Sequence, residues 1–156
     1  MINQFHINLE LQHIYLEVYA ERFHYLRRFL ESYYCYQHNL VTKQGKMDWE
    51  GIFQYAQRSK AASDISNRKQ LVREMTLPLP VLIGMLKVLV RDDKASIENI
   101  QRLLDAHFSY VIITREEHLA LKKVGLLERM PTTYYQEKST DFHLAATRFS
   151  AVDITF

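Results

Sequence analysis

Basic side chains are concentrated between residues 58 and 73, where their types and spacing are suited to binding phosphate groups. The cations of this segment are Arg58, Lys60, Arg68, Lys69 and Arg73. Lys and Arg neutralise phosphates, and the serines and the asparagine between them can hydrogen-bond to phosphate oxygens. Tyr55 lies about one turn before the segment and could stack on a base. The pattern predicts contact with DNA or RNA, and an ordinary solvated helix face is the alternative.

Glutamate and histidine occur twice at the spacing by which one helix offers two ligands to a metal ion, in Glu10-x-x-His13 and Glu21-x-x-His24. Di-iron helical bundles use the same spacing. In one continuous helix the two copies lie about 16 Å apart, because each residue rises by about 1.5 Å. A dinuclear centre needs metals about 4 Å apart and ligands from several helices. We therefore expect a polar helix face, no metal site and no cofactor.

Arg102 and His107 begin and end a short motif, Arg-Leu-Leu-Asp-Ala-His, near the end of a predicted helix. The motif resembles the Arg-x4-6-His element of HEPN-type ribonucleases. The resemblance implies a small helical bundle that dimerises to pair two motifs and cleaves RNA without a metal ion. His107 would then move the proton of a 2′-hydroxyl, and Arg102 would stabilise the charge on the phosphorane. The alternative is a solvated arginine and a histidine that ends the helix, where a cation is favourable.

The order helix, strand, helix over residues 96–127 resembles part of a winged helix. A helix over residues 96–107 would then enter the major groove of DNA. It would offer Asn99, Gln101 and Arg102 to the edges of bases. This interpretation depends on the order of the elements alone, and it adds a second way in which the chain could contact nucleic acid.

Three tyrosines, Tyr33, Tyr34 and Tyr36, stand within four residues. Tyrosine is common at interfaces because it offers a large contact area at a low cost in rotamer entropy. On a helix these rings cannot all face one core, because successive side chains point about 100° apart. Either a partner covers at least one of them, or the helix has neighbours on two sides.

The element that carries these tyrosines is predicted to be one helix over residues 8–38, which contain no glycine or proline. Its apolar residues recur every three or four positions, at Leu11, Tyr15, Tyr19, Phe23, Leu26, Leu30 and Tyr33. A helix of about 30 residues spans about 45 Å, more than the width of a domain of this size. We therefore expect it to protrude and to pack against a second copy of the chain.

The remaining elements are predicted from changes in periodicity. Helices are expected over residues 49–62, up to 75, 81–90, 96–107 and 115–125, and strands near 109–114 and 151–156. The scarcity of glycine and proline, 4 and 3 residues, favours long helices with few tight turns. The expected fold is mainly α, a helical bundle with a small C-terminal α+β corner. We expect a single domain over residues 1–156, with a helical body at 1–107 and the mixed part at 108–156.

Length and composition limit the classes of protein to which the chain can belong. A chain of 156 residues with 47% apolar and 24% charged residues is long enough to hold a core and is not intrinsically disordered. Lys and Arg total 20 against 18 Asp and Glu. This near-balance lacks the large positive excess of a protein that coats nucleic acid along its whole length. The lone cysteine, Cys35, cannot form an intrachain disulfide and favours a reducing compartment. We expect a cytoplasmic protein with no membrane partner.

The motifs together favour binding over catalysis. The glycines are isolated, so no phosphate-binding loop is predicted, and there is no Gly-x-Ser-x-Gly elbow. The first hypothesis is a non-catalytic helical interaction protein that self-associates and serves as a subunit or regulator of a nucleic-acid-handling assembly. The second is a HEPN-like ribonuclease that uses Arg102 and His107. The third is a purely protein-binding inhibitor or structural dimer.

Overall fold

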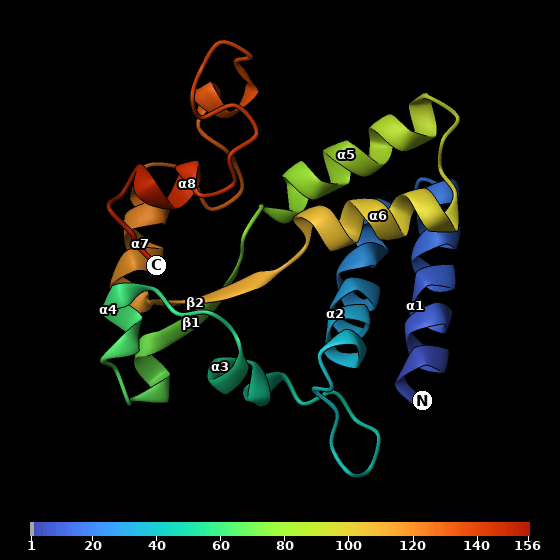
Figure 1. The fold of residues 1–156 in the computed structure, drawn as a ribbon, viewed down its shortest axis with the longest axis horizontal. Helices are drawn as coiled ribbons and strands as arrows, with labels where there is room; N and C mark the ends of the chain where they lie inside the picture. Colours follow the sequence, from blue (N-terminus) through green and yellow to red (C-terminus); the bar gives the residue numbers. More distant parts are fainter. Residues whose placement is uncertain (1) are drawn as a thin grey trace. The chain divides into compact units, whose positions relative to one another are not determined.

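Helices account for most of the secondary structure, which confirms the mainly α fold class. The computed structural model describes residues 2–156, with residue 2 described by its backbone alone. The chain forms two compact units (Figure 1). Unit 1 comprises Met1–Gln54 and Leu82–Phe108, and unit 2 comprises Tyr55–Val81 and Ser109–Phe156. Residues 55–81, which we expected in the helical body, therefore belong with the C-terminal part.

The elements follow one another in mixed order along the chain. The helices are α1 (Ile2–Tyr19), α2 (Leu26–Gln37), α3 (Ile52–Tyr55), α4 (Lys60–Ser63), α5 (Leu79–Arg91), α6 (Ile97–His107), α7 (Arg115–Lys123) and α8 (Thr147–Ser150). The strands are β1 (Leu71–Met75) and β2 (Tyr110–Thr114). Short 3-10 turns occur at Phe23–Tyr25, Trp49–Gly51, Arg68–Gln70 and Thr132–Tyr135.

Unit 1 contains two helices where the sequence predicted one. The helix expected over residues 8–38 is broken between α1 and α2, which pack side by side (Figure 1). Their facing sides and α6 form an apolar core that includes Leu11, Ile14, Val18, Leu26, Leu30, Ile100 and Leu104. The chain therefore folds back on itself here, and the argument that a 45 Å helix must protrude was wrong.

The break is a helix-ending turn made without glycine. Glu21 adopts a left-handed conformation with φ of 56°. The amides of Glu21 and Arg22 donate to the carbonyls of Val18 and Glu17, at 3.0 and 2.9 Å. This is a Schellman arrangement, in which glycine is the usual residue at the left-handed position. The same left-handed position is occupied at the ends of α2, α5 and α8 by Asn39, Asp93 and Asp153. Few glycines therefore did not mean few turns.

The helix expected over residues 49–62 is also interrupted. It begins as predicted, because Asp48 accepts a hydrogen bond from the Gly51 amide at 3.2 Å. It ends at Tyr55, and the backbone then runs extended through Arg58, which forms a parallel bridge with Ile112 of β2. The expected helices over 81–90 and 96–107 are present as α5 and α6.

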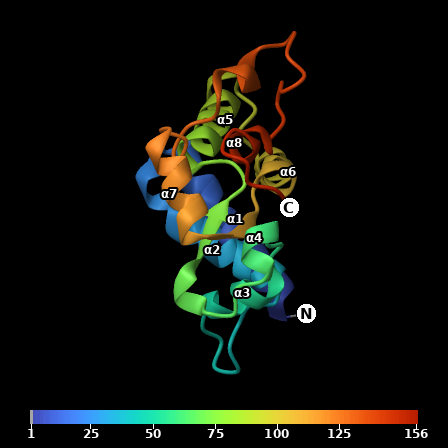
Figure 2. The ribbon, with the colours of Figure 1, turned by 90° about the vertical axis from the view of Figure 1, so that its left-hand side faces the viewer.

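Unit 2 is organised around a short antiparallel sheet of β1 and β2. Leu71 pairs with Thr114 and Met75 with Tyr110. The helix expected to reach Met75 is therefore wrong there, because pairing with β2 outweighs the weak helix preference of this segment. α4 and α7 pack beside the strands (Figure 2).

The strand predicted at 109–114 is confirmed as β2, whereas the one predicted at 151–156 is wrong. Residues 151–156 form turns and irregular chain after α8. The Ile154 amide donates to the Phe149 carbonyl at 3.0 Å, which closes the helix end. Val152 and Ile154 still point inward, because the unit 2 core comprises Val111, Ile113, Leu121, Phe149 and Ile154 with Val72 and Val152 against it. Phe156 is exposed.

Candidate functional site

The predicted basic segment divides into cations that serve the fold and cations that face solvent. Arg58 donates to the carbonyls of Ala62 and Ile65, at 3.2 and 3.1 Å, and so holds the end of α4. Arg73 is half-buried on β1. Lys60, Arg68 and Lys69 are exposed, although Arg68 also donates to the Leu71 carbonyl at 3.3 Å. The segment is therefore less basic at its surface than its sequence suggested.

The sheet brings one further cation to Arg68 and Lys69. Because Leu71 pairs with Thr114, Arg115 at the start of α7 lies beside the residues that precede β1. The Arg115 Nε donates to the carbonyl of Lys69. We call Arg68, Lys69 and Arg115 the basic corner. Arg115 lies 46 residues beyond Lys69 in sequence, so only knowledge of the strand pairing could have identified it.

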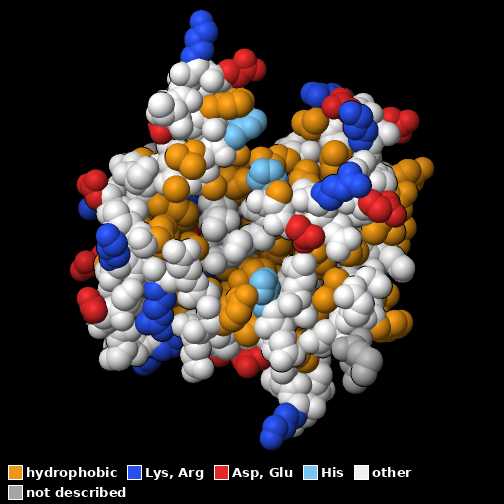
Figure 3. All heavy atoms as spheres, viewed as in Figure 1, with side chains coloured by type: hydrophobic (Ala, Val, Ile, Leu, Met, Phe, Trp, Pro, Cys, Tyr) orange, Lys and Arg blue, Asp and Glu red, His pale blue; other side chains and the backbone are white. Residues whose placement is uncertain are grey.

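The surface around this corner is not uniformly positive. Figure 3 shows Lys and Arg side chains at the lower left, over the part of unit 2 where Figure 1 draws α4 and β1. Asp and Glu side chains are interspersed with them. The corner therefore offers local phosphate contacts and not a broad electrostatic footprint.

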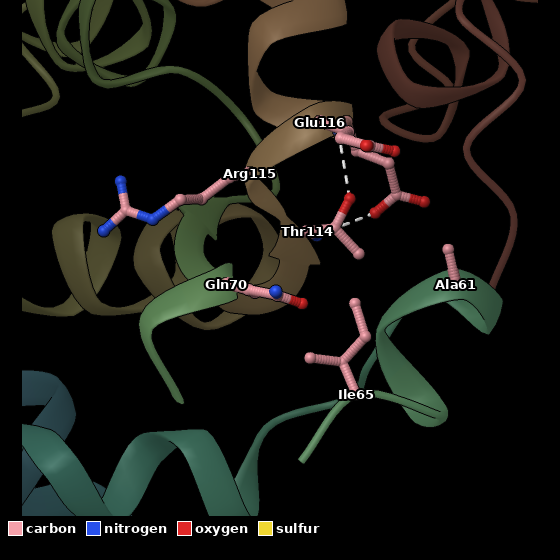
Figure 4. Close-up of a pocket in the computed structure, with 7 residues that line it drawn as sticks. Ala61, Ile65, Gln70, Thr114, Arg115 and Glu116 are labelled. Carbon is pink, nitrogen blue, oxygen red and sulfur yellow. Dashed lines mark hydrogen bonds between the residues drawn. The ribbon is translucent and has the colours of Figure 1, made fainter. Parts of the chain in front are cut away.

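A cavity of about 400 Å³ lies next to the basic corner in unit 2. Its lining is partly polar and partly aliphatic: Ala61, Ile65, Gln70, Thr114, Arg115, Glu116 and Glu117. In Figure 4, Ala61 and Ile65 lie across the cavity from Glu116, and the Arg115 side chain extends in the other direction. The cavity thus has carboxylates within it and a cation at its rim.

A hydrogen-bond network fixes one wall of this cavity. The Glu117 Oε2 accepts from the Ser59 hydroxyl at 2.7 Å and from the Thr114 amide at 2.9 Å. The Glu117 amide donates to the Thr114 hydroxyl at 3.0 Å, which completes the capping box predicted from Thr-x-x-Glu. Ser59 also accepts from the Ala62 amide at 3.1 Å. One carboxylate therefore joins the starts of α4 and α7.

A second polar cluster in unit 2 is built around Arg148, whose side chain is 0% exposed. Its guanidinium lies 3.4 Å from a Glu74 oxygen, donates to the Leu126 carbonyl at 3.1 Å and donates to the Met75 carbonyl. The other Glu74 oxygen lies 3.3 Å from His118 Nδ1. Burial lowers the pKa of Arg148, and the nearby Glu74 carboxylate opposes that shift. The cluster ties α8 to β1, and sequence analysis missed it.

Arg102 and His107 lie on one helix, α6, five residues apart. That spacing turns their side chains roughly 140° from one another. Arg102 is exposed and donates to the Asn99 side chain at 3.3 Å, and the Asn99 amide group donates to the Lys94 carbonyl. The structure therefore does not bring Arg102 to His107 within one chain. Two of the three residues proposed to read DNA bases, Asn99 and Arg102, therefore bond to each other and to the start of their own helix. The third, Gln101, bonds to the side chain of Tyr33.

Tyr33 and Tyr34 are buried in unit 1, with 0% and 2% of their surface exposed. The Tyr33 hydroxyl donates to Asp105 at 2.9 Å and accepts from Gln37 at 2.9 Å. Burial, followed by the hydrogen bond to Asp105, raises the pKa of Tyr33. Tyr36 is half-buried and its ring stacks on His6. The rings of Tyr33 and Tyr34 face neighbours within the same chain, which fits the alternative of a helix with neighbours on two sides. An interface at Tyr36 stays a prediction.

An apolar surface is found instead on α1. Phe5, Leu16 and Tyr19 are 65%, 58% and 70% exposed. They share an arc of roughly 120° with the other exposed side chains that the structure describes on this helix, which are Gln4, Asn8 and Gln12. None of these six side chains is charged. Figure 3 shows hydrophobic side chains along the right edge, over α1. We call these six residues the α1 face.

The two Glu-x-x-His pairs do not share a helix, because α1 ends at Tyr19. His13 Nδ1 lies 3.5 Å from the Glu10 carboxylate, whereas Glu21 lies in the turn after α1. Within residues 2–156, no group of three or more His, Cys, Asp or Glu side chains is placed to hold a metal ion. No helix in that range combines the length and apolar character needed to cross a membrane.

Comparison with known proteins does not supply a relative. No protein-family model matches the chain, and neither a curated protein nor a solved structure resembles it closely enough to count as a match.

Proposed function

We propose that this protein is a non-catalytic subunit that self-associates through the α1 face and contacts nucleic-acid phosphates through the basic corner. The observation that carries the first part is the absence of charge on the exposed side of α1. The proposal places the protein in the cytoplasm, with support from the lone cysteine, which is buried.

Self-association is supported by the composition and area of the α1 face. Interface cores are depleted in charged residues and enriched in aromatic ones. Phe5, Leu16 and Tyr19 expose roughly 350 Å² of apolar surface between them, given the usual size of such side chains. A standard interface buries roughly 800 Å² on each partner, a little over half of it apolar. A second copy suits this face because two uncharged surfaces meet without repulsion.

The α1 face is tested by Leu16→Asp, with Leu119→Asp as the matched control. Leu119 is also an exposed helical leucine, 54% exposed on α7. We expect sedimentation equilibrium to show a concentration-dependent dimer for the parent and the control, and a monomer for Leu16→Asp. The desolvated carboxylate would face its own copy across the interface. Equal association of both variants would remove the α1 face from the proposal.

Phosphate contact is supported by the convergence of Arg68, Lys69 and Arg115 at one end of the sheet. Three contacts of this kind are enough for weak, salt-dependent binding and too few for tight nonspecific binding. We expect single-stranded oligonucleotides to bind at low salt, with a slope of about −2 in log affinity against log salt.

Charge-reversal variants distinguish binding at the basic corner from a general effect of net charge on affinity. Arg68→Glu with Lys69→Glu should abolish oligonucleotide binding. Lys43→Glu with Lys46→Glu makes the same change in net charge in an exposed loop of unit 1 and should lower affinity only slightly. Equal losses in the two double variants would show that net charge, and not the corner, governs binding.

A further inference from the structure

We propose that the cavity beside the basic corner binds a guanine base of a single-stranded nucleic acid. This inference rests on the proposed nucleic-acid function and adds a base preference to it. The cavity volume of about 400 Å³ is at the small end of the range for ligand sites and suits one base and not a large cofactor.

The order of charge across the site indicates what kind of ligand it fits. Arg68 and Lys69 stand outside the cavity and Arg115 stands at its rim, whereas the Glu116 and Glu117 carboxylates belong to its lining. A ligand that satisfies both needs an anionic group at one end and hydrogen-bond donors at the other. A nucleotide has that order. A lysine or arginine side chain of a protein partner does not, because the rim would repel it.

The lining of the cavity supplies acceptors and an apolar surface. Glu117 is already committed, since its Oε2 accepts from Ser59 and Thr114. Glu116 is exposed and lies across the cavity from Ala61 and Ile65 (Figure 4). A flat ring can lie against the two aliphatic side chains while its edge meets the Glu116 carboxylate.

Guanine is the base whose edge matches a carboxylate. Its N1–H and N2 amino group are adjacent donors, and two parallel bonds to one carboxylate give both strength and specificity. Uracil offers a single ring N–H between carbonyl oxygens, which a carboxylate repels. Adenine and cytosine offer one amino group beside an acceptor. The base must also be unpaired, because the Watson–Crick edge is hidden in a duplex.

The test compares heptamers of uridine whose central nucleotide is guanosine, inosine, adenosine or uridine, by fluorescence anisotropy with the full chain. Inosine keeps the N1–H of guanine and lacks the N2 amino group. We expect the guanosine heptamer to bind on the order of tenfold more tightly than the uridine heptamer, with inosine between them. Glu116→Gln should reduce the ratio of guanosine to uridine affinity to about one, and the exposed Glu128→Gln should leave it unchanged.

The outcomes separate this inference from the function on which it rests. Equal binding of all four heptamers overturns the guanine site and leaves phosphate contact standing. No binding of any heptamer at low salt overturns the proposed nucleic-acid function itself. A guanosine preference that survives in Glu116→Gln overturns the role assigned to that carboxylate.

Discussion

The two units bury different kinds of side chain. In the part of the chain that the structure describes, the buried polar and charged residues are Ser59, Thr114, Thr147 and Arg148, and all belong to unit 2. Unit 1 buries aliphatic and aromatic side chains, and its best-defined polar contact is the Tyr33 hydroxyl with the exposed Asp105. Both units therefore hold an apolar core, and unit 2 in addition contains buried hydrogen bonds and one buried cation.

The exposed surfaces of the two units also differ in the kind of side chain that they present. Unit 1 exposes the uncharged α1 face, whereas unit 2 exposes the basic corner and a cavity that contains carboxylates. The hydrogen bonds of unit 2 hold the Glu117 carboxylate and the Arg148 guanidinium in fixed positions. We propose that association and ligand binding are divided between the units.

The largest expected effect is that of Arg148→Ala. Removing the guanidinium leaves Glu74 without its buried partner and leaves the Met75 and Leu126 carbonyls without a donor. We expect the free energy of opening unit 2 to fall by about 4 kcal/mol. The measurement is hydrogen exchange of the β2 amides.

The control for this prediction is Arg129→Ala. Arg129 is exposed in the same unit, so its loss should change stability by less than about 0.5 kcal/mol. If β2 protection changes equally in both variants, the buried cation is not what holds unit 2 together.

The stability of unit 1 should depend on the volume of its buried side chains and not on buried charge. Leu30 is 1% exposed on α2. We expect Leu30→Ala to destabilise unit 1 by about 3 kcal/mol, through lost burial and the cavity left behind. Urea unfolding followed by fluorescence of Trp49, the only tryptophan and a unit 1 residue, reports this directly. A change below about 1 kcal/mol would contradict a packed helical core here.

The smallest effect is a dependence on pH at Tyr33. The folded state keeps this hydroxyl protonated above the usual tyrosine pKa near 10, because burial and the Asp105 hydrogen bond raise its pKa. Unfolding then releases a proton above about pH 10, so stability falls by about 1.4 kcal/mol per pH unit there. Tyr33→Phe should remove that component and cost about 1 kcal/mol at neutral pH. The free energy of unfolding of both proteins is measured against pH by Trp49 fluorescence. If it falls with the same slope in both above about pH 10, Tyr33 does not titrate in this way.

Local patterns predicted the elements that local interactions decide. The capping box at Thr114, the strand after Ser109 and the helices α5 and α6 follow from residues close together in sequence. The break after Tyr19 did not, because Glu21 in a left-handed turn carries no signal that a glycine would carry. The strand at 71–75 was missed because its preference is weak and its partner lies about 40 residues away.

The candidate site was predicted only in part, for the same reason. Arg68 and Lys69 are adjacent in sequence and were identified as basic surface. Arg115 and Glu116 join them only through the pairing of β1 with β2. Tyr34 was assigned to an interface because a helix alone does not reveal that Trp49 and Phe108 pack around it.

We assign association to unit 1 and ligand binding to unit 2. The most direct test is to measure the mass of the eluting protein by light scattering, with and without a labelled uridine heptamer. The account predicts a mass of twice 18.6 kDa for the parent chain. Leu16→Asp should halve the mass and still bind the heptamer, and Arg68→Glu with Lys69→Glu should keep the mass and lose the heptamer. A parent chain that stays monomeric, or variants that lose both properties together, would contradict the assignment of association to unit 1 and ligand binding to unit 2.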